Sequence, residues 1–170
     1  MKKALSLVLL SLLLLTTSAS ALTAFPAFDD FELEFEYAAI LTGSGHYITS
    51  NNLSVEDGSY SKVYTVSFDD TLSMLVSVPH ETGEISEAMM LYASDGTTLS
   101  ALNFIYGIGE LAMATGAIDA VEEIWDFLGL LGLLDHMEDG DSNSIIIGQL
   151  EYSYMAYTSL GIFFYVTIVE

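Results

Sequence analysis

The segment DHMEDGDSNS, from Asp135 to Ser144, contains the densest group of potential metal ligands in the chain. Calcium in proteins is held by roughly six to eight oxygen atoms, mostly from carboxylates, amides and backbone carbonyls. The side chains that could supply such oxygens are Asp135, Glu138, Asp139, Asp141 and Asn143. This stretch is therefore the candidate metal site, and Ca²⁺ is the one cofactor that the sequence suggests.

The spacing of these acids does not match an EF-hand loop. With Gly140 at the invariant glycine position, Met137 takes the third ligand position and Ile146 the twelfth, and neither side chain carries an oxygen. Two interpretations stay open. The segment is either an irregular calcium site or an acidic turn from a helix to a strand, with Gly140 at a positive φ angle. The missing ligands favour the turn.

Residues for other kinds of catalysis are too scattered to predict a site. The histidines are His46, His80 and His136, and no two of them have the four-residue spacing of a helical zinc site. Ser44 precedes His46 by two residues, but it lacks the strand-turn-helix context of a nucleophile elbow. We therefore favour a non-enzymatic protein. The alternative is an extracellular hydrolase, calcium-assisted or carboxylate-based, that uses the acidic loop beside His136.

The charge of the chain excludes several classes of partner. It contains 3 Lys and Arg residues against 24 Asp and Glu, which gives a formal net charge of −21. Nucleic acids and anionic lipid surfaces are bound through Lys and Arg, so neither is expected as a partner. Proteins and neutral ligands remain. Cysteine is absent, which excludes disulfides, thiol catalysis and cysteine-bound metal.

The N-terminus has the three parts of a secretory signal peptide. Lys2 and Lys3 precede an apolar run from Ala4 to Leu15, and Ala19-Ser20-Ala21 fits a signal peptidase site. The run is shorter than the roughly 20 residues of a membrane span. We expect cleavage after Ala21 in a bacterial protein that is secreted or held at the cell surface. Residues 22–170 then form a single domain with Lys62 as its sole Lys or Arg.

Alternating apolar and polar residues predict several strands. The first is FELEFEYAA, where Phe31, Leu33, Phe35 and Tyr37 alternate with the glutamates of a solvated face. A loop with a short strand at 46–49 follows. A meander is then expected over 61–68, 72–78 and 85–93, because short turn-forming segments separate these runs.

Three- and four-residue spacing predicts two helices between this meander and the C-terminal strands. Thr97 or Thr98 is the expected N-cap of the first, and the second begins near Asp119. Gly107, Gly109 and Gly116 either weaken the first helix or permit close approach to a neighbour. Acidic residues interrupt residues 104–134, and a carboxylate at mid-bilayer costs about 2.5–3.5 kcal/mol, so this segment is not a membrane hairpin.

The chain is predicted to end in two strands, 144–157 and 161–169, and the second is apolar on both faces and so central in its sheet. Tyr152 and Tyr154 fit packing in the sheet. If exposed, they become candidate contacts for a protein or sugar partner.

The expected fold is α+β, with element order β-β-β-β-α-α-β-β and a two-helix layer on one face of an antiparallel sheet. The functional prediction is a secreted or cell-surface acidic module that binds an unknown partner. A structural module of an envelope assembly is a further alternative.

Overall fold

A computed structural model describes residues 25–134, 138–157 and 159–169. Its strands are β1 (Leu53–Asp57), β2 (Ser61–Ser67), β3 (Leu72–Pro79), β4 (Glu87–Tyr92), β5 (Ser142–Ile147), β6 (Leu150–Tyr157) and β7 (Gly161–Ile168). Its helices are α2 (Phe28–Thr42), α3 (Thr98–Ala114) and α4 (Ile124–Leu131), the last preceded by a 3₁₀ turn at Val121–Glu123.

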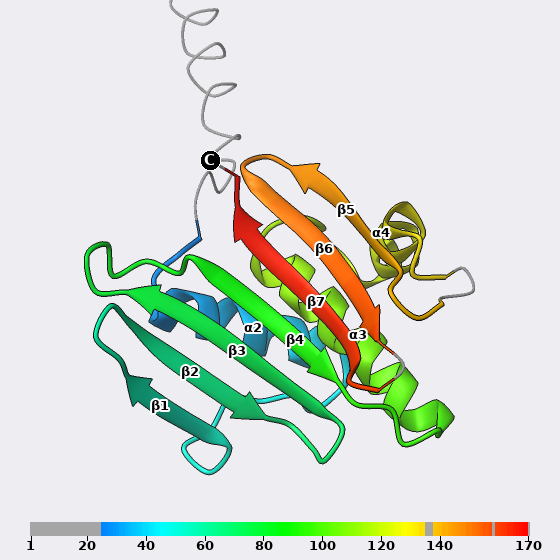
Figure 1. Cartoon of the computed structure of the whole chain (residues 1–170), viewed down its shortest axis with the longest axis horizontal. Helices are drawn as coiled ribbons and strands as arrows, with labels where there is room; N and C mark the ends of the chain where they lie inside the picture. The colour runs from blue at the N-terminus through cyan, green and yellow to red at the C-terminus, as the bar shows by residue number, and fades with distance from the viewer. Residues whose placement is uncertain (1–24, 135–137, 158, 170) are drawn as a thin grey trace, which may run out of the picture.

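The strands form one antiparallel seven-stranded sheet in the order β1-β2-β3-β4-β7-β6-β5. All three helices lie on one side of it, behind the sheet in Figure 1. Helices α2 and α3 pack against each other, and α4 lies against β5 and β6. The α+β class and the antiparallel sheet are therefore confirmed.

Alternation along each central strand places the core between the sheet and the helices. In β3, Leu72, Met74, Val76 and Val78 are buried, and the residues between them are only partly buried. The same pattern repeats in β4 and β6. Phe104, Ile108 and Leu111 of α3 meet this surface. Each strand therefore contributes every second residue to one core, as period-two geometry requires.

The first predicted strand is wrong, because residues 28–42 form helix α2. Phe28, Phe31, Phe35, Ala38 and Ala39 share its buried face. Phe31 and Phe35 are four residues apart, a spacing that fits both a strand and a helix. Leu33 and Tyr37, which the strand would bury, are 66% and 59% exposed. Gly43 then ends the helix at φ 70°, with its N–H donating to the Ala39 carbonyl.

The order of elements also differs from the prediction in two places, at strand β1 and at the hairpin of β5 and β6. Strand β1 lies at Leu53–Asp57, in the segment expected to be a loop, and 46–49 contains no strand. The predicted strand 144–157 is a hairpin, since Gly148 (φ 65°) and Gln149 turn β5 back along β6. Four strands, two helices and three strands thus follow α2.

Other predictions are confirmed. The meander is β2, β3 and β4, and β7 is central, between β4 and β6. Thr97 is the N-cap of α3, and its side chain accepts a hydrogen bond from the Ser100 N–H. Within the described ranges, no helix combines the length and the hydropathy needed to cross a bilayer.

Gly109 allows α3 to pack closely against the start of α4. A Cβ atom at this position would lie 2.5 Å from Cδ1 and 2.7 Å from Cγ1 of Ile124, a buried side chain. Isoleucine is branched at Cβ and has few alternative rotamers, so it cannot easily move aside. The glycine is therefore required by helix packing, which is the second of the two interpretations given above.

We expect Gly109→Ala to lower the free energy of unfolding by about 1–3 kcal/mol, because overpacking outweighs the better helix propensity of alanine. Gly129→Ala in α4 is the matched control. The nearest atom to its added Cβ is Leu134 Cδ1 at 3.9 Å, so it should be neutral or raise stability by up to about 1 kcal/mol. Urea unfolding of both variants measures the difference; equal effects would contradict the packing argument.

Candidate functional site

The face of the sheet opposite the helices is covered by no described element (Figure 1). Its side chains come from the alternate residues of all seven strands, and all are at least partly exposed. We call this surface the open face. Its large apolar and aromatic residues are Val63, Leu75, Met89, Leu91, Ile146, Met155, Tyr157, Phe163 and Tyr165.

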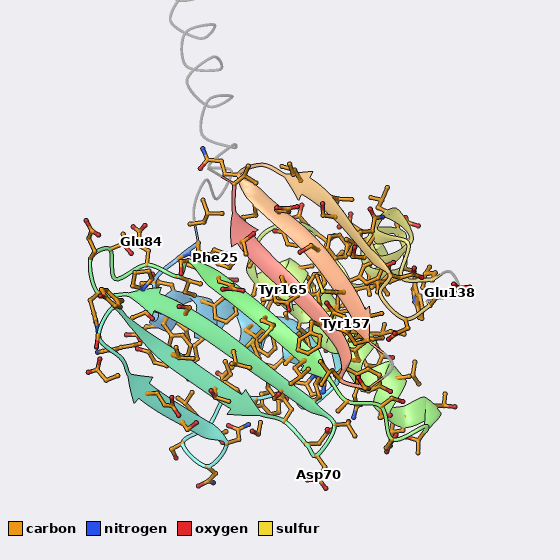
Figure 2. The ribbon with its side chains drawn as sticks, viewed as in Figure 1. Phe25, Asp70, Glu84, Glu138, Tyr157 and Tyr165 are labelled. Carbon is orange, nitrogen blue, oxygen red and sulfur yellow. The ribbon has the colours of Figure 1, made fainter. Side chains whose placement is uncertain are left out.

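The strand register brings these side chains into contiguous rows. One row runs across the sheet through Leu75, Met89 and Tyr165, and the next through Leu91, Phe163 and Met155. The Phe163 and Tyr165 rings stack at 6.2 Å, and Tyr157 meets Phe163 edge-on at 6.1 Å. Tyr157 and Tyr165 can be located on β6 and β7 in Figure 2. The centre of the open face is therefore a continuous apolar and aromatic surface.

Carboxylates border this surface on one side. Glu56, Glu87 and Glu151 occupy the same face of β1, β4 and β6 by the register of the strands. Burial raises the pKa of the Tyr165 hydroxyl, and the negative charge of Glu87 and the nearby Tyr157 add to the rise. Lys62 lies opposite the buried Val78, so it belongs to the other face of the sheet. The open face thus combines an apolar centre with an acidic border.

A buried polar cluster lies on the helix side of the sheet. Glu110 of α3 is 0% exposed and His46 is 5% exposed. The His46 Nδ1–H donates to Glu110 Oε2 at 2.7 Å, and the Thr42 hydroxyl donates to Oε1 at 2.5 Å. The His46 ring also packs on Phe68 at 5.0 Å. These contacts fasten the C-terminus of α2 and the loop after it to α3.

The pair of His46 and Glu110 resembles a catalytic dyad in composition but not in setting. A dyad needs a nucleophile or substrate within reach of the second imidazole nitrogen. The Ser44 hydroxyl instead accepts from the His46 backbone N–H at 3.1 Å. Neither His46 nor Glu110 lines either of the two cavities described below. The described geometry therefore assigns the pair to holding the helices together.

The acidic segment forms a turn over residues 138–141 with Gly140 at φ 89°, as the turn interpretation predicts. Asp141 Oδ2 accepts from the Glu138 N–H at 2.6 Å, and the Asn143 amide donates to the Leu131 carbonyl at 3.0 Å. Among the described residues no three His, Asp or Glu side chains come together as a metal site. Asp135 and His136 lie outside the described residues, so the calcium site stays a prediction.

Tyr152 and Tyr154 face the helices and are 1% and 7% exposed. The exposure required for partner contact is therefore not met at either residue in this structure. The Tyr152 hydroxyl donates to Thr115 Oγ1 at 3.0 Å, and its ring meets Phe127 edge-on. On β6 and β7 the tyrosines of the open face are Tyr157, which is 37% exposed, and Tyr165, which is half-buried, and the sequence analysis selected neither. The sequence could have indicated Tyr157, because it lies three residues after Tyr154 and five after Tyr152. An odd spacing along a strand places it on the face opposite these two buried tyrosines.

We expect His46→Leu and Glu110→Leu each to cost about 3–5 kcal/mol in the free energy of unfolding, because each strands a buried polar partner. The double variant should cost far less than the sum, since no buried charge remains unpaired. His80→Leu is the control: His80 pairs with Asp57 at 3.2 Å in solvent, so its loss should cost less than about 1 kcal/mol. Urea unfolding gives all four values, and additive single effects would rule out the coupling.

Burial raises the pKa of Tyr152 to about 12, from an ordinary value of 10.0. The folded protein therefore holds this proton more tightly than the unfolded chain does. The contribution of Tyr152 to the free energy of unfolding is fully present below pH 10 and falls by about 2–3 kcal/mol as the pH rises toward 12. Tyr152→Phe should be less stable than the wild type at pH 7 by about 1 kcal/mol and should lose less stability at alkaline pH.

Denaturant unfolding of wild type and Tyr152→Phe between pH 7 and pH 12 checks this expectation. Tyr60→Phe, at a side chain that is 88% exposed, controls for loss of a tyrosine. Parallel pH profiles for wild type and Tyr152→Phe would contradict the assigned cause.

Comparison with known proteins adds no template for this site. No protein-family model, curated protein or solved structure matches the chain. The function is therefore inferred from the open face, the buried cluster and the charge of the chain.

Proposed function

We propose that the chain is a secreted or cell-surface, non-enzymatic module that binds another protein through the open face. The observation that carries the proposal is the row of apolar and aromatic side chains on a sheet face without helices. Contiguous exposed apolar surface of this kind is uncommon on soluble monomers and marks interaction sites. The N-terminal segment, with the features of a secretory signal, supports the extracellular location.

The composition of the open face indicates the chemistry of the partner. Aromatic residues and methionine are enriched in the centres of protein interfaces, while charged residues lie at the rim. Phe163, Tyr165 and Met89 fit such a centre, and Glu56, Glu87 and Glu151 fit an acidic rim. The matching surface has an apolar centre and a basic border.

Two other occupants are less favourable on electrostatic grounds. A second copy would bring the glutamates of two chains together across a twofold axis, and each chain has a formal charge of −21. An anionic membrane would meet the same carboxylates without basic residues to attract it. A basic-rimmed protein gains from the charges that repel both alternatives.

The test begins with capture of proteins by immobilised residues 22–170 from the secreted and surface fractions of the producing cell. The purified partner is then titrated by calorimetry. Phe163→Ser should weaken its binding at least tenfold, because centre residues dominate interface energetics. Replacing Glu56, Glu87 and Glu151 by Gln should mainly slow association and reduce its dependence on salt.

Leu33→Ser, on the exposed side of α2, is the matched control and should bind as the wild type does. Melting curves establish that each variant is folded. Two results would overturn the proposal: a partner that is lost with Leu33→Ser but kept with Phe163→Ser, or self-association of the wild type through the open face in sedimentation experiments.

A further inference from the structure

Two cavities adjoin where β4 ends and β7 begins. The first has a volume of about 320 Å³ and lies between α3, α4 and the end of the sheet, with Ala101, Phe104, Ile105, Ile108 and Leu128 in its wall. The second, of about 350 Å³, lies beyond it against the turn after α4 and the start of β7. Both are lined by Tyr92, Ser94 and Ile162.

The first cavity is separate from the open face, whereas Tyr157 of the open face also lines the second. Ile162 pairs with Tyr92 and alternates with Phe163 along β7, so it lies on the helix side of the sheet. The wall of the first cavity comes mainly from α3 and α4, which do not reach the open face. The apolar part of a ligand would therefore lie on the helix side of the sheet, and its head group would lie at the edge where the second cavity meets Tyr157.

The first cavity is suited to an apolar group. Leu133 and Leu134 line it next to α4, and of the described residues around it only Tyr92 and Ser94 have polar side chains. The Tyr92 hydroxyl is hydrogen-bonded to Ser100 Oγ at 3.0 Å and so is already paired. The volume of the first cavity is at the lower end of the range for small-molecule pockets. At roughly 30 Å³ for each water-sized group, it holds about ten non-hydrogen atoms.

The residues around the second cavity indicate which charge on a ligand would be favoured there. Glu138 and Asp139 line it, and the Glu138 side chain projects at the edge of the molecule in Figure 2. Lys62, the one Lys or Arg among the described residues, is on β2, separated from β7 by β3 and β4. Among the described residues, a carboxylate or sulfate head group would therefore meet carboxylates and no Lys or Arg. An ammonium group would meet opposite charge.

We propose that the two cavities together bind a small cationic amphiphile, with an apolar chain of about ten carbon atoms in the first and an amine or quaternary ammonium group in the second. The apolar part gains from removal from water, and the head group stays at the solvent-exposed mouth beside Glu138. This site does not depend on the protein partner proposed for the open face.

The test uses three probes with the same decyl chain, each below its micelle-forming concentration: decyltrimethylammonium, decyl maltoside and decyl sulfate. Calorimetry should show one saturable site for decyltrimethylammonium, at least tenfold tighter than for decyl sulfate, with the maltoside between them. Tetramethylammonium, which lacks the chain, should show no saturable binding. Equal affinity for all three decyl probes, or no binding of any, would overturn the proposal.

Variants separate the two cavities. Ala101→Phe fills the first and should weaken decyltrimethylammonium binding at least tenfold, whereas Leu99→Phe, at an exposed position of α3, should not. Glu138→Gln with Asp139→Asn should reduce the preference for the cation severalfold and leave maltoside binding unchanged. Glu81→Gln with Glu84→Gln removes the same charge from a loop at the opposite side of the sheet and is the matched control.

A structural readout keeps the test decisive if Ala101→Phe fails to fold. In the wild type, proton NMR contacts between the decyl chain and the Ile105 and Ile108 methyl groups should appear on titration. Contacts to Leu75 or Phe163 in their place would mean that the amphiphile binds to the open face, and the cavity proposal would be wrong.

Discussion

Burial of only one face of the sheet is the constraint on which the rest of this structure depends. Three helices pack against alternate residues of the strands, and no described element packs against the others. Because successive side chains of a strand point to opposite faces, each inward residue fixes an outward neighbour. In β7, burying Phe164 and Val166 places Phe163 and Tyr165 outside. The binding surface is thus a direct consequence of how the core is built.

The strongly acidic composition imposes a second requirement on the core. A fully buried carboxylate needs hydrogen-bond donors, and in other proteins Arg or Lys commonly supplies them. This chain has no Arg, and its described part has only Lys62, which lies on β2. Glu110 is satisfied instead by the imidazole of His46 and the hydroxyl of Thr42. A histidine in a Gly- and Ser-rich loop therefore takes the position of a missing basic residue.

The sequence predicts the fold well where periodicity is unambiguous and fails where one spacing fits two structures. The β2–β4 meander and the central position of β7 follow from patterns that permit one interpretation, and the N-cap of α3 is Thr97, one of the two threonines expected. The spacing of Phe31 and Phe35 permits two interpretations, because four residues are both two periods of a strand and about one turn of a helix. The hairpin at Gly148 was hidden within a run of β-forming residues. As a result Ile146 pairs with Glu151 across the hairpin and is exposed.

The site was harder to predict than the fold because it depends on contacts between residues distant in sequence. His46 and Glu110 are 64 residues apart, and no local motif links them. The acidic segment at 138–141 attracted attention by its composition, yet the Asp141 carboxylate accepts a hydrogen bond within the turn. The open face is different. The sequence divides each strand into two sets of alternate residues, one for each face of the sheet. Identifying the exposed set requires knowing which face the helices cover.

Gly161 links the geometry of both proposed binding surfaces. It has φ 103°, and a Cβ atom there would lie 2.0 Å from the Tyr92 carbonyl oxygen, so only glycine permits this approach of β7 to β4. That contact sets the register at the start of β7, where Ile162 pairs with Tyr92 and Phe163 with Leu91. A slip of one residue would exchange the faces of Ile162 and Phe163. The cavity would then lose its apolar wall, and the open face would lose its central aromatic ring.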